Sequence, residues 1–441
     1  MIGRRLARLA WLTLLPLPWA DPRGPVPAVR ASEPDTLTSA YEVSGVHVIQ
    51  RVSPASDVVA VRLYLLGGTR QITAATAGTE VLFLKASEYG TAEFTGGAAH
   101  RAAGSVGARF TIEADADWTV FGFTGLAQDF DAAWQIFAER LMHPTLSDAA
   151  VEQARGKLLT AARRRYTEPD ERIHLIAMQA LFRDHPYAID PYGTPESLSR
   201  ISAATVRTYA HDQVVTSRML LVVVGNATRA HVESLVGATL GQLPPGDYRW
   251  TLPPPPPQRR SGWLIEHRQL PTTYLLAYFV GPPPTSHRYW AFRVATAILS
   301  SRLYLAIRVR RSLSYDAYAP YLDGGIPVGG AYVSTRKPDS ALSVMIDQIN
   351  GLRQCEADYA SLARFINGFT FDYIAENASA ESQADFLARA QQYLGDYRQG
   401  AEFLRRLRSV QPYDLCHVTT EYVTHLQFAY LGDTARMHGT W

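Results

Sequence analysis

The sequence lacks the features that mark several common classes of enzyme and binding protein. It has no G-x-S-x-G nucleophile elbow, no Walker loop and no cysteine in a catalytic context. Its formal net charge is only +2, which gives no case for nucleic acid or acidic partners. The sequence therefore does not support an autonomous enzyme that uses one of these sites.

Cysteine is scarce, and Cys355 and Cys416 are its two copies. In an oxidising compartment these two residues could form one disulfide within the C-terminal half. Two separate buried thiols fit the sequence equally well. The pair is a poor zinc site, because the cysteines are far apart and no histidine cluster lies near either.

Long apolar runs are also missing, since no segment after the start reaches the roughly 18 apolar residues that cross a bilayer. The start is a basic segment, "MIGRRLAR", followed by a short apolar one, "LAWLTLLPLPWA". The small side chains of Val29 and Ala31 match the pattern that signal peptidase cleaves, with cleavage after Ala31. Ala20 marks a second candidate cleavage site. We expect a signal peptide over residues 1–31 and an exported, periplasmic protein with no membrane span after cleavage. An uncleaved membrane anchor is the alternative.

What is present is a long globular chain. Its 441 residues are 47% hydrophobic and 19% charged, which predicts two or more folded domains. Five consecutive prolines in "LPPGDYRWTLPPPPPQRRSG" favour an extended, semi-rigid spacer over residues 243–262. The sequence therefore predicts one domain over residues 41–242 and another over 263–441.

The two halves repeat the same order of patterns. Each opens with a strand-like run, continues through a helical segment and alternating strand-like sequence, and then gives long helices. This mixture predicts an α+β fold of two related domains, in which helices pack on one face of mixed or antiparallel sheets. The strand-like and helical runs include "VVAVRLYLLGGT", "TYLLAYFVG", "RFTIEADADWTVFGFTG", "RMLLVVVGNA" and "ALSVMIDQINGLRQ".

Several of these segments carry a resemblance to a known family. They include "LLGGTR", "AGTEVLFLKASEYGT", "DHPYAIDPYGTPESLSRIS" and "AILSSRLYLAIRVRRSLSY". From about residue 41 onward, the chain resembles the pitrilysin/insulinase metallopeptidase family. The resemblance implies a tandem of related α+β domains. Catalytic members hold Zn²⁺ with His-x-x-Glu-His on one helix and a further Glu on a later helix.

The zinc motif of that family is absent here. The two histidine positions are Val81 and Lys85, the general-base position is Leu84, and Ala161 stands where the distant carboxylate belongs. We expect a buried helix over this stretch that holds no metal, with the neighbouring Glu80 and Glu88 facing solvent. No other histidine spacing replaces the motif, as inspection of His100, His143, His174 and His185 shows.

A second family pattern is retained in "RVRRSLSY". Arg308 and Tyr315 stand seven residues apart, where the family places an Arg at a helix end and a Tyr at the start of the next strand. There a phenol can hydrogen-bond a developing oxyanion, while a guanidinium fixes the peptide. The glycine run that the family usually carries before "SSRL" is missing, so the resemblance does not give the shape of the loop expected near Ser300. The glycines of "DGGIPVGG" (323–330) could line a substrate chamber or form a simple turn.

Some family members divide the site between two chains, and this chain has only the second pattern. The resemblance implies a subunit without its own cofactor, which supplies Arg308 and Tyr315 to a homologous zinc-bearing partner that cleaves peptides. The competing hypothesis is an inactive scaffold or binding protein with a peptidase fold.

Overall fold

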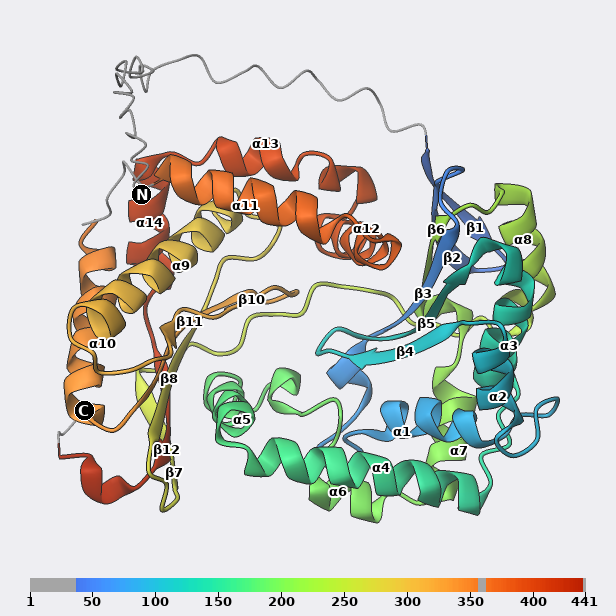
Figure 1. Ribbon diagram of the computed structural model, residues 1–441, viewed down its shortest axis with the longest axis horizontal. Helices are drawn as coiled ribbons and strands as arrows, with labels where there is room; N and C mark the ends of the chain where they lie inside the picture. Colours follow the sequence, from blue (N-terminus) through green and yellow to red (C-terminus); the bar gives the residue numbers. More distant parts are fainter. Residues whose placement is uncertain (1–36, 356–361, 439–441) are drawn as a thin grey trace, which may run out of the picture. The chain divides into compact units, whose positions relative to one another are not determined.

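The computed structural model describes residues 37–355 and 362–438, and the predicted signal peptide lies outside them. Within these ranges, two sheets of mixed strand direction are each packed with helices (Figure 1). The predicted α+β class is therefore confirmed. No helix in the described ranges is long and apolar enough to cross a lipid bilayer.

The first sheet is built around the predicted strand "RMLLVVVGNA". This segment forms β6 (Met219–Gly225), which is buried along its whole length and pairs in parallel with β2 and antiparallel with β3. A continuous apolar run is what a strand covered on both faces requires. The strand order is β1-β2-β6-β3-β5-β4. The other strands are β1 (Thr38–Val43), β2 (Val46–Val52), β3 (Val58–Leu66), β4 (Arg109–Ala114) and β5 (Trp118–Leu126).

The second sheet repeats this topology. Its order is β7-β12-β8-β11-β10, with β9 also paired to β11. The parallel pair β7–β12 corresponds to β2–β6, and β8 lies between β12 and β11 as β3 lies between β6 and β5. The predicted repetition of the two halves is confirmed. The strands are β7 (Gly262–His267), β8 (Thr273–Val280), β9 (Ala317–Tyr318), β10 (Tyr321–Leu322), β11 (Val328–Thr335) and β12 (Gln427–Gly432).

The helices follow the same duplication. By their order among the strands, α1, α3, α4 and α5 of the first half correspond to α9, α10, α11 and α12 of the second. The first half contains α1 (Thr79–Ala86), α2 (Ala98–Ser105), α3 (Phe130–Met142), α4 (Asp148–Thr167), α5 (Pro169–Leu181), α6 (Pro195–Arg200), α7 (Ala203–Gln213) and α8 (Arg229–Ala238). The second contains α9 (Tyr289–Leu303), α10 (Pro338–Arg353), α11 (Leu362–Glu376), α12 (Ala380–Leu394), α13 (Phe403–Arg408) and α14 (Pro412–Tyr422).

Two corresponding helices exchange partners between the halves. Helix α5 packs on β8 and β12 of the second sheet, and α12 packs on β3 and β6 of the first (Figure 1). Ile173 and Ile176 of α5 join Tyr278 in one apolar cluster, while Leu387 of α12 joins Leu220 in another. Most of each sheet lies in one predicted domain range, although β1 begins at Thr38 and β7 at Gly262. A helix of the other range covers one face of each sheet.

A phenol-to-carboxylate hydrogen bond accompanies each exchanged helix. The Tyr332 hydroxyl of β11 donates to Asp170 of α5, and the Tyr64 hydroxyl of β3 donates to Asp385 of α12. Both tyrosines are almost fully buried. Because a buried hydroxyl without a partner is costly, these two bonds fix where each helix lies on its sheet.

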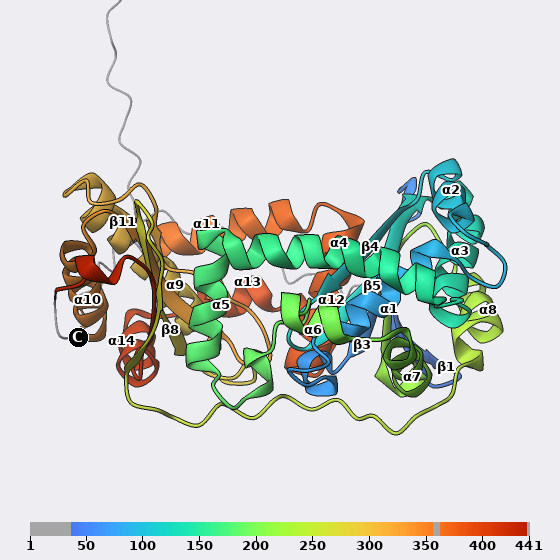
Figure 2. The ribbon, with the colours of Figure 1, turned by 90° about the horizontal axis from the view of Figure 1, so that it is seen from below.

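The predicted proline spacer has no helix or strand between Leu243 and Ser261, and Figure 2 shows it as an extended trace. It is attached at several points. The Trp250 indole nitrogen donates to the Gln392 carbonyl at 3.0 Å, and His185 Nε2 lies 3.1 Å from the Pro254 carbonyl oxygen. The segment therefore packs on helices and loops of both halves.

The two cysteines form a disulfide. Cys355 at the end of α10 is bonded to Cys416 on α14, with their Cα atoms 4.9 Å apart. Of the two alternatives left by the sequence, the disulfide is the one observed. It closes a loop across a sequence separation of 61 residues.

Replacing both cysteines by serine is expected to lower the free energy of unfolding by about 2–4 kcal/mol, because the unfolded chain regains the entropy of an open loop. Urea denaturation with and without reductant measures this. Reductant should destabilise the wild type by a similar amount and leave the double variant unchanged. An equal response of both proteins to reductant would contradict the assignment.

Candidate functional site

The helix in the zinc-motif position is packed into the core. Val81 and Leu84 of α1 are 1% and 0% exposed, within the apolar cluster of the first half. Ala161 is on the exposed surface of α4. An aliphatic side chain offers no lone pair to a metal, so these positions do not fit Zn²⁺. The described residues also contain no group of three His, Cys, Asp or Glu side chains that could hold a metal ion.

The remaining motif position, Lys85, belongs to an ion-pair cluster. Its ammonium lies 3.1 Å from Glu88 Oε1, and the Arg140 guanidinium lies 3.3 Å from the same oxygen. Arg140 also donates to the Leu84 carbonyl, and burial lowers its pKa to about 10. We predicted that Glu88 faces solvent, but it is half-buried. It lies beside the end of α1, where it pairs with both Lys85 and Arg140.

The position of Glu80 contradicts the sequence prediction more strongly than that of Glu88. It is 5% exposed and forms an ion pair with Arg218 at 2.9 Å, although we predicted that it faces solvent. The Tyr209 hydroxyl donates to the same carboxylate oxygen at 2.7 Å, and Arg218 also donates to the Leu66 carbonyl. Burial and the Glu80 charge hold the pKa of Tyr209 well above its usual value. A buried carboxylate is tolerated here because each neighbouring donor is matched to it.

The histidines are dispersed. His174 of α5 contacts the Tyr278 hydroxyl at 2.6 Å and stacks on Tyr332, and burial lowers its pKa. His185 accepts a hydrogen bond from the Tyr187 amide through Nδ1. These two histidines therefore make packing and turn contacts.

The structure brings the predicted pair Arg308 and Tyr315 together. Helix α9 runs through Ser300 without a loop and continues as a π-helical turn over Tyr304–Val309. The Arg308 guanidinium carbon lies 5.1 Å from the centre of the Tyr315 ring. Tyr315 precedes β9 and is 81% exposed. No ion pair or hydrogen bond to another described side chain occupies either the guanidinium or the phenol, so both polar groups remain available.

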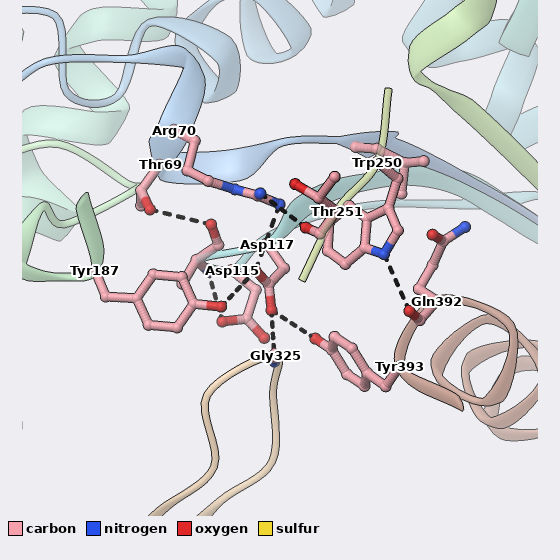
Figure 3. A network of polar contacts seen from close by, with 12 residues as sticks. Thr69, Arg70, Asp115, Asp117, Tyr187, Trp250, Thr251, Gly325, Gln392 and Tyr393 are labelled. Atoms are coloured by element: carbon pink, nitrogen blue, oxygen red, sulfur yellow. Dashed lines mark hydrogen bonds and ion pairs between the residues drawn. The ribbon is translucent and has the colours of Figure 1, made fainter. Parts of the chain in front are cut away.

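A polar network that the sequence did not predict joins the two halves at Asp117 (Figure 3). This carboxylate, which directly precedes β5, is 2% exposed. It accepts hydrogen bonds from the Tyr187 hydroxyl, the Tyr393 hydroxyl at 2.9 Å and the Gly325 amide at 2.8 Å. Arg70 adds an ion pair at 4.0 Å. Burial and the Asp117 charge raise the pKa of both tyrosines, so each phenol keeps the proton that it donates.

The glycines of "DGGIPVGG" therefore have a structural use of their own. A Cβ on Gly325 would lie 2.6 Å from Pro253 of the spacer and 3.1 Å from the Asp117 carboxylate, so only glycine allows this close approach. Arg70 extends the contact by donating to the Thr251 carbonyl and lying over the Trp250 ring. The loop, the spacer and the first sheet thus meet at one buried charge.

Comparison with known families agrees with this architecture. Residues 47–194 match the insulinase family, peptidase family M16. Residues 200–369 match the domain described as the peptidase M16 inactive domain. This chain belongs to the M16 peptidase family. The loss of every zinc-motif position is therefore a departure within the family.

Curated relatives are similar over part of their length. An uncharacterized zinc protease of Mycobacterium leprae is 26% identical over 288 residues, which cover 62% of this chain and 63% of that protein. An uncharacterized zinc protease of Bacillus subtilis is 22% identical over 294 residues, covering 64% and 70%. The aligned region thus spans less than two thirds of the Mycobacterium protein.

Solved structures share the fold over almost the whole chain. A structure described as the peptidase M16 inactive domain from Pseudomonas fluorescens has a TM-score of 0.81 at 18% identity, and covers 90% of this chain and 98% of its own. A chain of complex III from Candida albicans has a TM-score of 0.77 at 15% identity, with coverage of 91% and 97%. At these identities the likeness shows the fold alone.

Removing the partner of Glu80 is expected to be strongly destabilising. Arg218→Met leaves a buried carboxylate without its cation, and we expect the free energy of unfolding to fall by about 3–5 kcal/mol. The control is Arg200→Met, which breaks an exposed ion pair with Glu196 and should cost less than about 1 kcal/mol. Urea denaturation of both variants measures the difference, and similar losses would contradict the role of the buried pair.

Asp117→Ala removes the acceptor for three buried donors, and we expect it to lower the free energy of unfolding by about 3–5 kcal/mol. Asp115→Ala is the matched control, because Asp115 accepts only from the adjacent Ala116 amide. It should change stability by about 1 kcal/mol or less. Denaturant unfolding of the full chain provides the test, and an equal effect of the two changes would count against Asp117 as the junction.

Proposed function

We propose that this chain is the subunit without a zinc site in a two-chain M16 peptidase of the periplasm. A homologous partner supplies the metal and the general base, and peptides are the substrates. The observation that carries the proposal is the contrast between two sites of the family. None of the four zinc-motif positions carries a metal ligand, since Val81 and Leu84 are buried in the core, Lys85 is a cation and Ala161 is an exposed methyl group. Arg308 and Tyr315, in contrast, lie in contact, are exposed, and have no other polar partner among the described side chains.

The chemistry of the pair suits this division. The Tyr315 hydroxyl donates a hydrogen bond to the carbonyl oxygen of the scissile peptide as negative charge develops on it. Arg308 binds the peptide backbone and adds positive charge at longer range. A Zn²⁺ ion held by the partner would supply a Lewis acid for the carbonyl and for water. Stacking of the guanidinium on the Tyr315 ring limits the motion of both groups before substrate arrives.

The surface around the pair supports a partner contact. Tyr304, Leu305 and Val309 on the π-helical turn are 43%, 41% and 56% exposed. Together with Tyr315 they place large apolar side chains side by side at a surface. The partner would cover these residues, so that the phenol and guanidinium reach into its zinc site.

Purification from the exported fraction tests the assembly. We expect a homologous chain carrying His-x-x-Glu-His to co-purify, with about one zinc per pair. Chelation should abolish peptide hydrolysis, and added zinc should restore it. A lone, zinc-free protein would reject the two-chain enzyme and favour the scaffold hypothesis.

Tyr315→Phe tests the catalytic assignment in the assembled complex. Loss of one oxyanion donor is expected to reduce kcat by about 10²–10³-fold, while assembly and zinc content stay unchanged. Tyr413→Phe is the control, because Tyr413 is an exposed tyrosine on α14. Its complex should hydrolyse peptides at the wild-type rate. Full activity of the Tyr315→Phe complex would reject the role of the phenol.

A further inference from the structure

The second half contains a cavity of about 720 Å³ that the proposed function does not use. Its walls come from α9, α11, α12 and α13 and from the β10 loop. In the order of the duplication, α9, α11 and α12 correspond to α1, α4 and α5. The hollow therefore lies among the counterparts of α1 and α4, which carry the zinc-motif positions of the first half, and of α5.

One wall of the cavity is aromatic. Tyr373 stacks on Phe403 with ring centres 5.1 Å apart, and Trp290 meets the edge of Phe403 at 5.2 Å. Phe386 contacts both Tyr373 and Phe403. A contiguous aromatic wall of this kind binds an apolar or cationic group by burial and by cation–π attraction.

The polar groups of the cavity leave negative charge in excess. A second cavity of about 270 Å³ shares Asp385 and Arg389 with the first, so the two meet at α12. The guanidiniums that line them are Arg62, Arg293 and Arg389, and the carboxylates are Glu113, Asp115, Asp323, Asp372 and Asp385.

Each of these guanidiniums already has a carboxylate partner. Arg62 pairs with Glu113 and Asp385, while Arg293 and Arg389 pair with Asp323. In the described part of the chain, no cation pairs with Asp372, which adjoins the aromatic Tyr373. Asp115 of the smaller cavity has no ion-pair partner in the described part of the chain either. Among the described carboxylates that line the larger cavity, Asp372 is the unpaired one, and it is solvent-exposed and lies beside the aromatic wall.

We propose that this cavity binds a basic segment of a peptide. Its ammonium or guanidinium group meets Asp372, and its apolar side chains lie on the wall of Trp290, Tyr373 and Phe403. The choice of a peptide over another basic amphiphile rests on the proposed peptidase function.

The cavity is placed to act with the Arg308–Tyr315 pair. Ser301 of α9 lines the cavity, and Arg308 follows seven residues later on the continuing helical turn. That separation is about 10 Å along the helix axis. An extended peptide covers it in about three residues, at roughly 3.3 Å each. One substrate could therefore occupy the cavity and extend to the pair.

Isothermal titration of the full chain alone with amidated Arg-Phe dipeptide tests the site. We expect this probe to bind at least about tenfold more tightly than amidated citrulline-Phe, which has a similar shape and the same N-terminal ammonium but lacks the guanidinium charge. Asp372→Asn should weaken Arg-Phe binding by about tenfold. Asp347→Asn, an exposed carboxylate on α10, is the matched control and should leave the affinity unchanged.

A second variant tests the cavity without changing its charge. Ala297→Phe places a ring in the hollow and should weaken Arg-Phe binding by at least about tenfold, with the circular dichroism of the chain unchanged. Equal affinities for the two dipeptides, or wild-type binding by Asp372→Asn, would overturn the proposal. Tighter binding of spermidine than of Arg-Phe would overturn the assignment to peptides. Because binding is measured without a partner, its failure is distinct from a failure of the Tyr315→Phe test.

Discussion

The buried carboxylate of Asp117 is the constraint on which the relation between the two halves depends. Its partners come from Tyr187, Gly325 and Tyr393, which are far apart in the sequence. A carboxylate removed from water needs each of these donors, since an unmatched charge in the interior costs several kcal/mol. The loop that contains Gly325, the spacer and α12 are therefore held against the first sheet together, and none of them is held independently.

The exchange of α5 and α12 has the same consequence. A sheet with one uncovered apolar face is not stable in water, and each half obtains this cover from the other. Apolar burial alone does not fix the orientation of a helix on a sheet. The hydrogen bonds from Tyr332 and Tyr64 to carboxylates of α5 and α12 do fix it. The duplicated chain thus behaves as one structural unit from Leu37 onward.

The loss of the zinc motif is compatible with this fold because α1 has kept its packing. Val81 and Leu84 fill the apolar core, while the ion pairs of Glu80 and Glu88 fix the two ends of the helix. The second half instead keeps polar groups that form no ion pair with another described side chain. It presents an exposed guanidinium and phenol at the end of α9 and a hollow with a free carboxylate beside it.

The sequence by itself determined the α+β class, the repeated order of the halves, the buried helix at Val81 and the seven-residue spacing of Arg308 and Tyr315. These follow from local periodicity and from residue types in a short motif, which the linear chain displays. The tertiary structure alone determined that Glu80 is buried, that α5 and α12 exchange sheets, that Asp117 joins the two halves and that the cavity exists. A charged residue beside an apolar run reads as solvent-facing until its partner is known, and Arg218 lies 138 residues away. Such pairings depend on which distant segments the sheet brings together, and no local pattern records them.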